Sequence, residues 1–215
     1  MKKLTFKTGF MPNDGLDFVH QRKFMREALL EVCSPREVTI PMKQHRGTPC
    51  EPVVSVGDEV AMGDLIGAPR DMNGVPVHAS ISGTVTKIDN IRLPNKVSCK
   101  AVTIKNDLRR RVSSKIMPRK DYSSLPLSEL KKLLWASGIC GMGGEGIPTY
   151  TKCLRAEKLG VETLLVNCTQ SEPFLSCDLH HIRVNPGKVL QGAMALSGVC
   201  RVRRVVFCIE DTWTD

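Results

Sequence analysis

The sequence predicts an α+β protein of two domains, in which a small all-β domain precedes a partial α/β domain. Residues 36–105 consist of short apolar runs cut by Gly57-Asp58 and Gly63-Asp64, residue pairs that favour tight turns. Very short strands at this spacing are typical of a compact β sandwich or barrel. Beyond residue 125, helical periodicity alternates with short apolar runs, as in a β-α-β unit.

Changes in the pattern of apolar, charged and turn-forming residues divide the chain into four segments. The first, residues 1–35, is a leader with one expected helix, since Phe24, Ala28, Leu29 and Val32 share a helical face. The others are the β domain (36–105), a basic linker (106–125) and the α/β domain (126–215), which we expect to be truncated because it stops where its next helix should begin.

The α/β domain is expected to start with an amphipathic helix from Leu127 that ends at Gly138. A glycine-rich loop follows, and then a helix over residues 149–158. The apolar runs at 161–167 and 202–210 predict two strands of a parallel sheet covered on both faces, joined by a helix at about 186–197.

Composition restricts the class of protein. No apolar run approaches the ~18 residues of a membrane span, and the N-terminus lacks the apolar region of a secretory signal. The nine cysteines are scattered, without a C-x-x-C pair, which favours free thiols in a reducing, cytoplasmic setting. His45, His78, His180 and His181 spread over both domains, and we expect no metal site.

The net charge of +9 is unevenly distributed. Between Arg92 and Lys120 a single acid, Asp107, accompanies ten basic residues, at positions 92, 96, 100, 105, 109, 110, 111, 115, 119 and 120. Such a run can be a solvated linker or can contact an anionic membrane. No aromatic residues interleave with it, so nucleic acid is not the expected partner.

The β domain carries the motif VSVGDEVAMGDLI followed by HASISGTVTKI. This pairing resembles the lipoyl and biotinyl carrier domains, whose fold is a barrel-sandwich hybrid. In those carriers a lysine at the turn between the two halves is acylated. The corresponding stretch here, residues 68–79, contains no lysine. We therefore expect a scaffold or docking domain in place of a swinging arm.

The glycine-rich loop GICGMGGEGIPT is the most informative stretch for chemistry. Gly141, Gly143, Gly144 and Gly146 allow close backbone approach to a ligand. Pro148 lies at the start of a helix whose free N–H groups can hold a phosphate. The loop predicts a phosphate or flavin cradle, although plain turn structure is the alternative.

A second polar stretch, Asn167-Cys-Thr-Gln-Ser-Glu172-Pro173, follows the first predicted strand of the α/β domain. Ligands of open α/β sheets bind at such carboxyl ends. Asn167 can hydrogen-bond a flavin or sugar edge, and Glu172 can face a nicotinamide or a cation. A polar exit from strand to loop explains the same residues equally well.

Four stretches of the chain carry a resemblance to a known family: PMKQHRGTPCEPVVSVGDEVAMGDLIG, PVHASISGTV, GICGMGGEGIPTYTK and LLVNCTQSEPFLSCD. Taken together, they resemble the C subunit of the Rnf ion-translocating ferredoxin–NAD oxidoreductases and the related proline-reductase-associated proteins. The glycine loop is also similar to that of the flavin-carrying subunit of respiratory complex I. The resemblance implies electron transfer between NADH and iron–sulfur carriers through FMN. It also implies other complex subunits as partners and a cytoplasmic position at the inner face of the plasma membrane. The cofactor-binding residues it implies are Gly141, Gly143, Gly144, Gly146, Thr149, Lys152, Asn167 and Glu172.

Three departures from the family pattern support a rival interpretation. Glu145 stands where the family has alanine, Ile147 where it has phenylalanine, and Gln170 where it has an acid. The C-x-x-C-x-x-C runs that hold [4Fe–4S] clusters in the full-length family are absent from this chain. The rival is a redox-silent scaffold whose altered loop binds nothing. A weaker third hypothesis is a membrane- or nucleic-acid-binding module built on residues 92–120.

Overall fold

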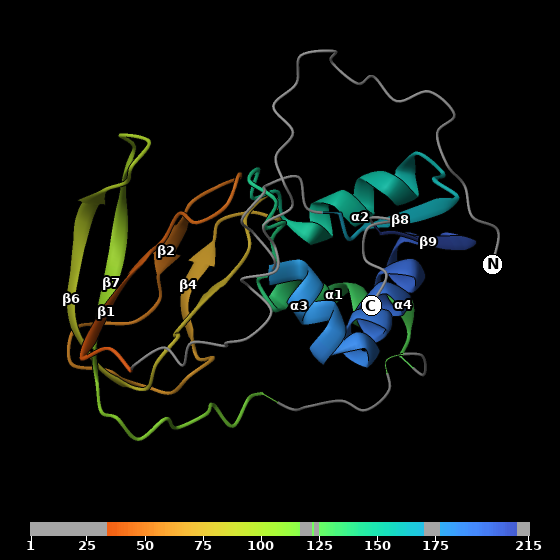
Figure 1. The fold of residues 1–215 in the computed structure, drawn as a ribbon. Coiled ribbons are helices and arrows are strands. Elements are labelled where there is room, and N and C mark those ends of the chain that lie inside the picture. Colours follow the sequence, from red (N-terminus) through yellow and green to blue (C-terminus); the bar gives the residue numbers. More distant parts are fainter. Residues whose placement is uncertain (1–33, 117–121, 123–124, 170–176, 210–215) are drawn as a thin grey trace, which may run out of the picture.

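The computed structural model describes residues 34–116, 122, 125–169 and 177–209. Figure 1 shows a β domain beside a helical part that includes a small parallel sheet. The fold is thus the α+β arrangement predicted from the sequence. The predicted leader helix lies outside the described residues, apart from Ser34 and Pro35.

The β domain consists of two antiparallel sheets. One has the strand order β1-β7-β6-β3 and the other the order β2-β4-β5. The strands are β1 Glu37–Pro41, β2 Cys50–Pro52, β3 Glu59–Val60, β4 Leu65–Pro69, β5 Val77–His78, β6 Gly83–Arg92 and β7 Ser98–Asn106. Strand β2 ends at Pro52, so the mostly apolar residues 53–56 before the first Gly-Asp pair are not part of a strand.

The core of the β domain lies between the two sheets. Met42, Ile66, Val102 and Ile104 are fully buried there, with Val85 beside them. Alternation along β6 and β7 directs Val85, Val102 and Ile104 inward and leaves threonines and lysines on the outer face.

The two Gly-Asp pairs form the same turn twice. Gly57 and Gly63 have φ of 98° and 87°, in the region that favours glycine. After each glycine, the aspartate carboxylate accepts the backbone N–H of the residue three positions earlier: Asp58 from Ser55 at 2.8 Å and Asp64 from Ala61 at 2.7 Å.

The first part of the segment predicted as a linker is attached to the β domain. Met62 exchanges backbone hydrogen bonds with Arg111 and Ser113, of 2.8 and 2.9 Å. The Ser113 hydroxyl donates to Asp64 at 2.6 Å, and the Ser82 hydroxyl donates to Asp107 at 2.6 Å. Asp64 therefore joins its own turn to this strap of residues 106–113.

The helical part contains α1 Leu127–Ala136, α2 Thr149–Lys158, α3 Cys177–Val184 and α4 Pro186–Cys200, with β8 Thr163–Asn167 and β9 Arg204–Cys208 in a parallel pair. Its core is formed by Cys153, Val199 and Cys200 with Leu130 and Leu134 of α1. Helix α3 was not predicted from the sequence. Leu165 of β8 is 62% exposed, so the described residues do not cover both sheet faces as expected.

None of the helices among the described residues has the length and apolar character needed to span a bilayer.

We predict that Asp64→Asn lowers the free energy of unfolding at pH 7 by about 1–2 kcal/mol, because the carboxylate accepts hydrogen bonds from the Ser113 hydroxyl and the Ala61 N–H. These bonds hold the pKa of Asp64 below its usual value. The ionised form therefore stabilises the fold above the ordinary aspartate pKa of about 4, and that contribution is lost as pH falls through the folded-state pKa.

Urea unfolding at pH 7 and at pH values below about 4 measures this effect. Asp58→Asn is the matched control, since its carboxylate accepts the turn N–H but has no bond to the strap among the described residues. The loss for Asp64→Asn should exceed that of the control and shrink as pH falls. Equal losses for both variants would contradict the role of the strap.

Candidate functional site

The glycine loop connects α1 to α2 and is closed at its base. Cys140 and Pro148 form an isolated antiparallel bridge. The Gly141 N–H donates to the Ile147 carbonyl at 2.9 Å, and the Thr149 N–H donates to the Ile139 carbonyl at 3.0 Å. Residues 142–146 therefore project from a fixed base.

The β domain contacts both ends of this loop (Figure 1). At the start, Gly138 has a φ of 71°, and a Cβ there would lie 2.5 Å from the Pro76 carbonyl oxygen. At the end, the Gly146 carbonyl accepts the Arg46 N–H at 2.7 Å, and Gly146 has a φ of 61°. These two glycines are needed by the fold itself.

The turn that would carry the lysine in a carrier domain is part of this contact. The Trp135 indole N–H of α1 donates to the Gly74 carbonyl at 3.0 Å. His45 is buried beneath the same turn, where its Nε2 lies 3.2 Å from the Thr48 carbonyl oxygen and 3.3 Å from the Val75 nitrogen. Burial lowers the pKa of His45, which favours the neutral ring. His45 therefore has a packing role beneath this turn.

The middle glycines differ from those at the ends. A Cβ built at Gly143 or Gly144 would meet nothing within 4 Å, and both residues are exposed. Gly144 has a φ of 101°, whereas Gly143 has no such backbone requirement. Neither protein contact nor backbone conformation requires glycine at position 143, so the backbone here is open to close approach by a ligand.

Lys152 and Gly141 lie together. A Cβ on Gly141 would be 2.8 Å from the Lys152 Nζ, so the ammonium of α2 reaches back over the loop. Thr149, in the first turn of α2, uses its N–H in closing the loop base. Lys152 is thus a candidate cation beside Gly141, at the start of the glycine loop.

Asn167 ends β8, where its side chain forms a local turn. Its Oδ1 accepts the Thr169 N–H at 3.1 Å and the Thr169 hydroxyl at 2.6 Å. The Asn167 amide NH2 group remains as a donor.

Helix α2 ends in a tight turn that leads into β8. The Gly160 N–H and Val161 N–H donate to the Glu157 and Ala156 carbonyls, and this turn sends β8 back toward the side where α2 begins. Glu172 and Gln170 lie outside the described residues.

Glu145 points toward the β domain side of the loop. Its carboxylate lies 4.0 Å from the Arg46 guanidinium, and both side chains are exposed. Arg46 and the neighbouring Lys43 were not among the predicted site residues, although both lie within the PMKQHRG motif.

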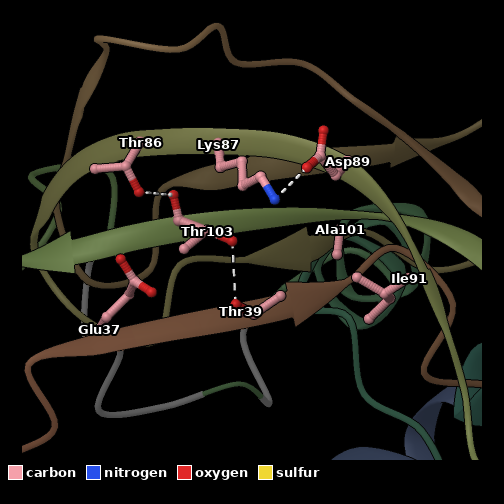
Figure 2. A pocket seen from close by; sticks show the side chains of 8 residues that line it. All are labelled: Glu37, Thr39, Thr86, Lys87, Asp89, Ile91, Ala101 and Thr103. Carbon is pink, nitrogen blue, oxygen red and sulfur yellow. Dashed lines mark hydrogen bonds and ion pairs between the residues drawn. The ribbon is translucent and has the colours of Figure 1, made fainter.

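Two of the cavities lined by described residues border the β domain. The larger, of about 570 Å³, lies between residues 43–47, residues 93–95 of the β6–β7 hairpin and residues 144–146 of the glycine loop. The smaller, of about 340 Å³, lies on the outer face of the larger sheet (Figure 2). Its wall includes Thr39 hydrogen-bonded to Thr103 at 3.0 Å and a Lys87–Asp89 ion pair of 2.5 Å. Lys87 and Asp89 in this wall are paired with each other, and no residue of the glycine loop lines the smaller cavity.

The basic run does not form one surface. Arg92 and Lys96 lie at the β6–β7 hairpin, whereas residues 109–111 follow the opposite end of β7. Lys100 pairs with Glu51 at 2.8 Å, and Arg111 pairs with Asp107 at 3.0 Å.

The eight cysteines in the described part of the chain are free thiols. No group of three or more metal-binding side chains occurs among the described residues.

Comparison with known protein families agrees with this two-part architecture. Residues 4–109 match the RnfC barrel-sandwich hybrid domain, and residues 134–215 match the Nuo51 FMN-binding domain. The second match includes the glycine loop, Lys152 and Asn167.

Curated relatives cover both parts of the chain. The C subunit of the Na⁺-translocating ferredoxin:NAD⁺ oxidoreductase complex of Acetobacterium woodii is 30% identical over 220 residues, which cover 100% of this chain and 47% of that protein. The C subunit of the proton-translocating ferredoxin:NAD⁺ oxidoreductase complex of Clostridium ljungdahlii is 29% identical, covering 96% of this chain and 44% of the relative. The C subunit of the ion-translocating oxidoreductase complex of Pectobacterium atrosepticum is 33% identical over 85% of this chain and 26% of its own length.

The chain thus spans less than half the length of each of these relatives. Both domain types occur in the order predicted from the sequence. The chain belongs to the RnfC family.

Proposed function

We propose that this chain forms the flavin- and NADH-binding part of an electron-transfer subunit that passes electrons between NADH and iron–sulfur carriers in a membrane-associated oxidoreductase complex. Family membership supports the proposal, since the relatives are named as subunits of ion-translocating oxidoreductase complexes. The observation that carries it is Gly143, an exposed glycine that neither the backbone nor any neighbouring atom requires.

The residues of the loop fit FMN. Gly143 and Gly144 present backbone without side chains, so a flat ring or a ribityl chain can lie against them. Lys152 offers an ammonium beside Gly141 for a phosphate or a ring carbonyl oxygen. Asn167 has amide donors at the end of β8 that take no part in the Asn167–Thr169 turn.

Gly143, Gly144, Lys152 and Asn167 would hold FMN, which would supply the link between two-electron hydride transfer and one-electron transfer. The chain's own contribution is to bind and orient the flavin at a loop whose base and ends are fixed. Because the loop is already held in place, less of its conformational entropy is lost when a ligand binds.

The redox-silent scaffold remains the rival function. One observation favours it, since the β domain docks onto the glycine loop through Gly138 and Gly146 in the manner of a packing contact. The two functions differ in whether the open middle of the loop binds flavin, and a titration separates them.

Location at the inner face of the membrane and contact of residues 92–120 with anionic lipid are further parts of the proposal. Exposed Arg92 and Lys96 at the β6–β7 hairpin support such a contact. Because the run divides between the two ends of β7, each end is a separate candidate for a lipid contact.

We predict that Gly143→Ala weakens FMN binding about tenfold or more, because the new methyl group occupies space that the ligand needs. Quenching of flavin fluorescence during titration measures the affinity. Thermal unfolding should change little, since a Cβ at this position meets no protein atom within 4 Å.

Gly187→Ala is the matched control, because its Cβ would also lie in open space and it has no positive φ, but it is part of α4. The control should bind FMN like the unaltered chain. Unchanged FMN affinity in Gly143→Ala would remove the observation on which the proposal rests.

We also predict that Lys152→Met raises the Kd for FMN about fivefold, an effect of about 1 kcal/mol, by removing the ammonium that reaches over Gly141. Lys158→Met, at the other end of α2, is the control and should leave the Kd unchanged. The salt dependence of FMN binding should fall in Lys152→Met alone. The same loss in both variants would show a general charge effect.

A further inference from the structure

The larger cavity combines parts of both domains. Residues 43–47 and the β6–β7 hairpin form its β-domain wall, and Gly144 to Gly146 form the opposite wall. Its volume of about 570 Å³ is within the range of small-molecule sites. A ligand lying against Gly144 could therefore extend into it and contact the β domain.

The β-domain wall is positively charged. Lys43 is half-buried and has no ion pair among the described residues. Within the described part of the chain, Arg46 has one ion pair, with the Glu145 carboxylate at 4.0 Å between exposed side chains. Such a long, solvated pair contributes little to stability, so Arg46 remains available to a stronger anion.

Three other polar side chains of the cavity wall together add one donor and one negative charge. His45 is buried with a lowered pKa, so it adds no charge of either sign as a neutral ring. Asn95 accepts the Val97 N–H with its Oδ1, which leaves its NH2 group as a donor. Glu145 is the single acid among the described residues of the cavity wall, and it lies beside Arg46.

We propose that this cavity binds the phosphate-bearing part of a nucleotide held at the glycine loop, with Lys43 and Arg46 of the β domain as its cationic partners. The phosphate replaces Glu145 beside Arg46, because a doubly charged oxyanion forms stronger charge-assisted hydrogen bonds than a solvated carboxylate at 4.0 Å. The inference rests on the proposed function, since a flavin or nicotinamide nucleotide supplies the phosphate.

Two sources can supply this group: the monophosphate of FMN and the pyrophosphate of NADH. Isothermal titration of the 215-residue chain with FMN, riboflavin, NADH and inorganic pyrophosphate distinguishes them. The variant is Lys43→Ala/Arg46→Ala, which keeps the Arg46 N–H and with it the backbone bond to Gly146. The charge-matched control is Lys105→Ala/Arg109→Ala, at the end of β7 away from the hairpin.

If the cavity holds the FMN phosphate, the double variant should bind FMN at least about tenfold more weakly and riboflavin normally. If it holds the pyrophosphate of NADH, NADH and inorganic pyrophosphate should lose at least about tenfold in affinity while FMN does not. In either case Glu145→Gln should bind the affected ligand about threefold more tightly, because the competing carboxylate is gone. The control should match the unaltered chain throughout.

Nucleotide affinities that stay the same in the double variant and in the unaltered chain would overturn this inference and leave the proposed function standing. Equal losses in the double variant and in the control would also overturn it. An unaltered chain that binds neither flavin nor NADH would contradict the proposed function, and this inference with it.

Discussion

The contact between the β domain and the two ends of the glycine loop determines how the rest of the molecule can work. The Arg46 N–H holds the Gly146 carbonyl at 2.7 Å, while Gly138 fits under the Pro76 carbonyl, where a side chain has no room. These contacts anchor residues at both ends and leave Gly143 and Gly144 open. A rigid support under an open stretch of backbone lets a ligand bind without first ordering the loop.

This contact also gives the β domain its role. Its motifs are similar to those of carrier domains, but the turn at residues 68–79 has no lysine to carry a group. In the structure that turn accepts the Trp135 indole N–H and is organised by buried His45. A segment that a carrier domain presents to solvent here contacts α1. The β domain thus positions the glycine loop, and the outer face of its larger sheet pairs Thr39 with Thr103 and Lys87 with Asp89.

Local signals allowed much of the fold to be predicted. The Gly-Asp turns, the helix at 149–158 and the apolar runs that become β8 and β9 depend on neighbouring residues in the sequence, and the structure contains them. Long-range contacts were not predictable in this way. Only tertiary packing shows that Gly138 and Gly146 serve the fold while Gly143 is free, that Ser113 bonds Asp64, or that Arg46 faces Glu145. Helix α3 was missed because Asp178 to Arg183 lack a clear apolar face.

The most direct test of the central claim is a titration of FMN into ¹⁵N-glycine-labelled chain, followed by the amide resonances of its 17 glycines. Gly143 and Gly144 lie in open space where a ligand can contact them, whereas Gly57 and Gly63 have structural roles in the β domain. The account predicts large, saturable shifts for Gly143 and Gly144 and none for Gly57 and Gly63. Saturable binding that leaves the Gly143 and Gly144 resonances unmoved would contradict it.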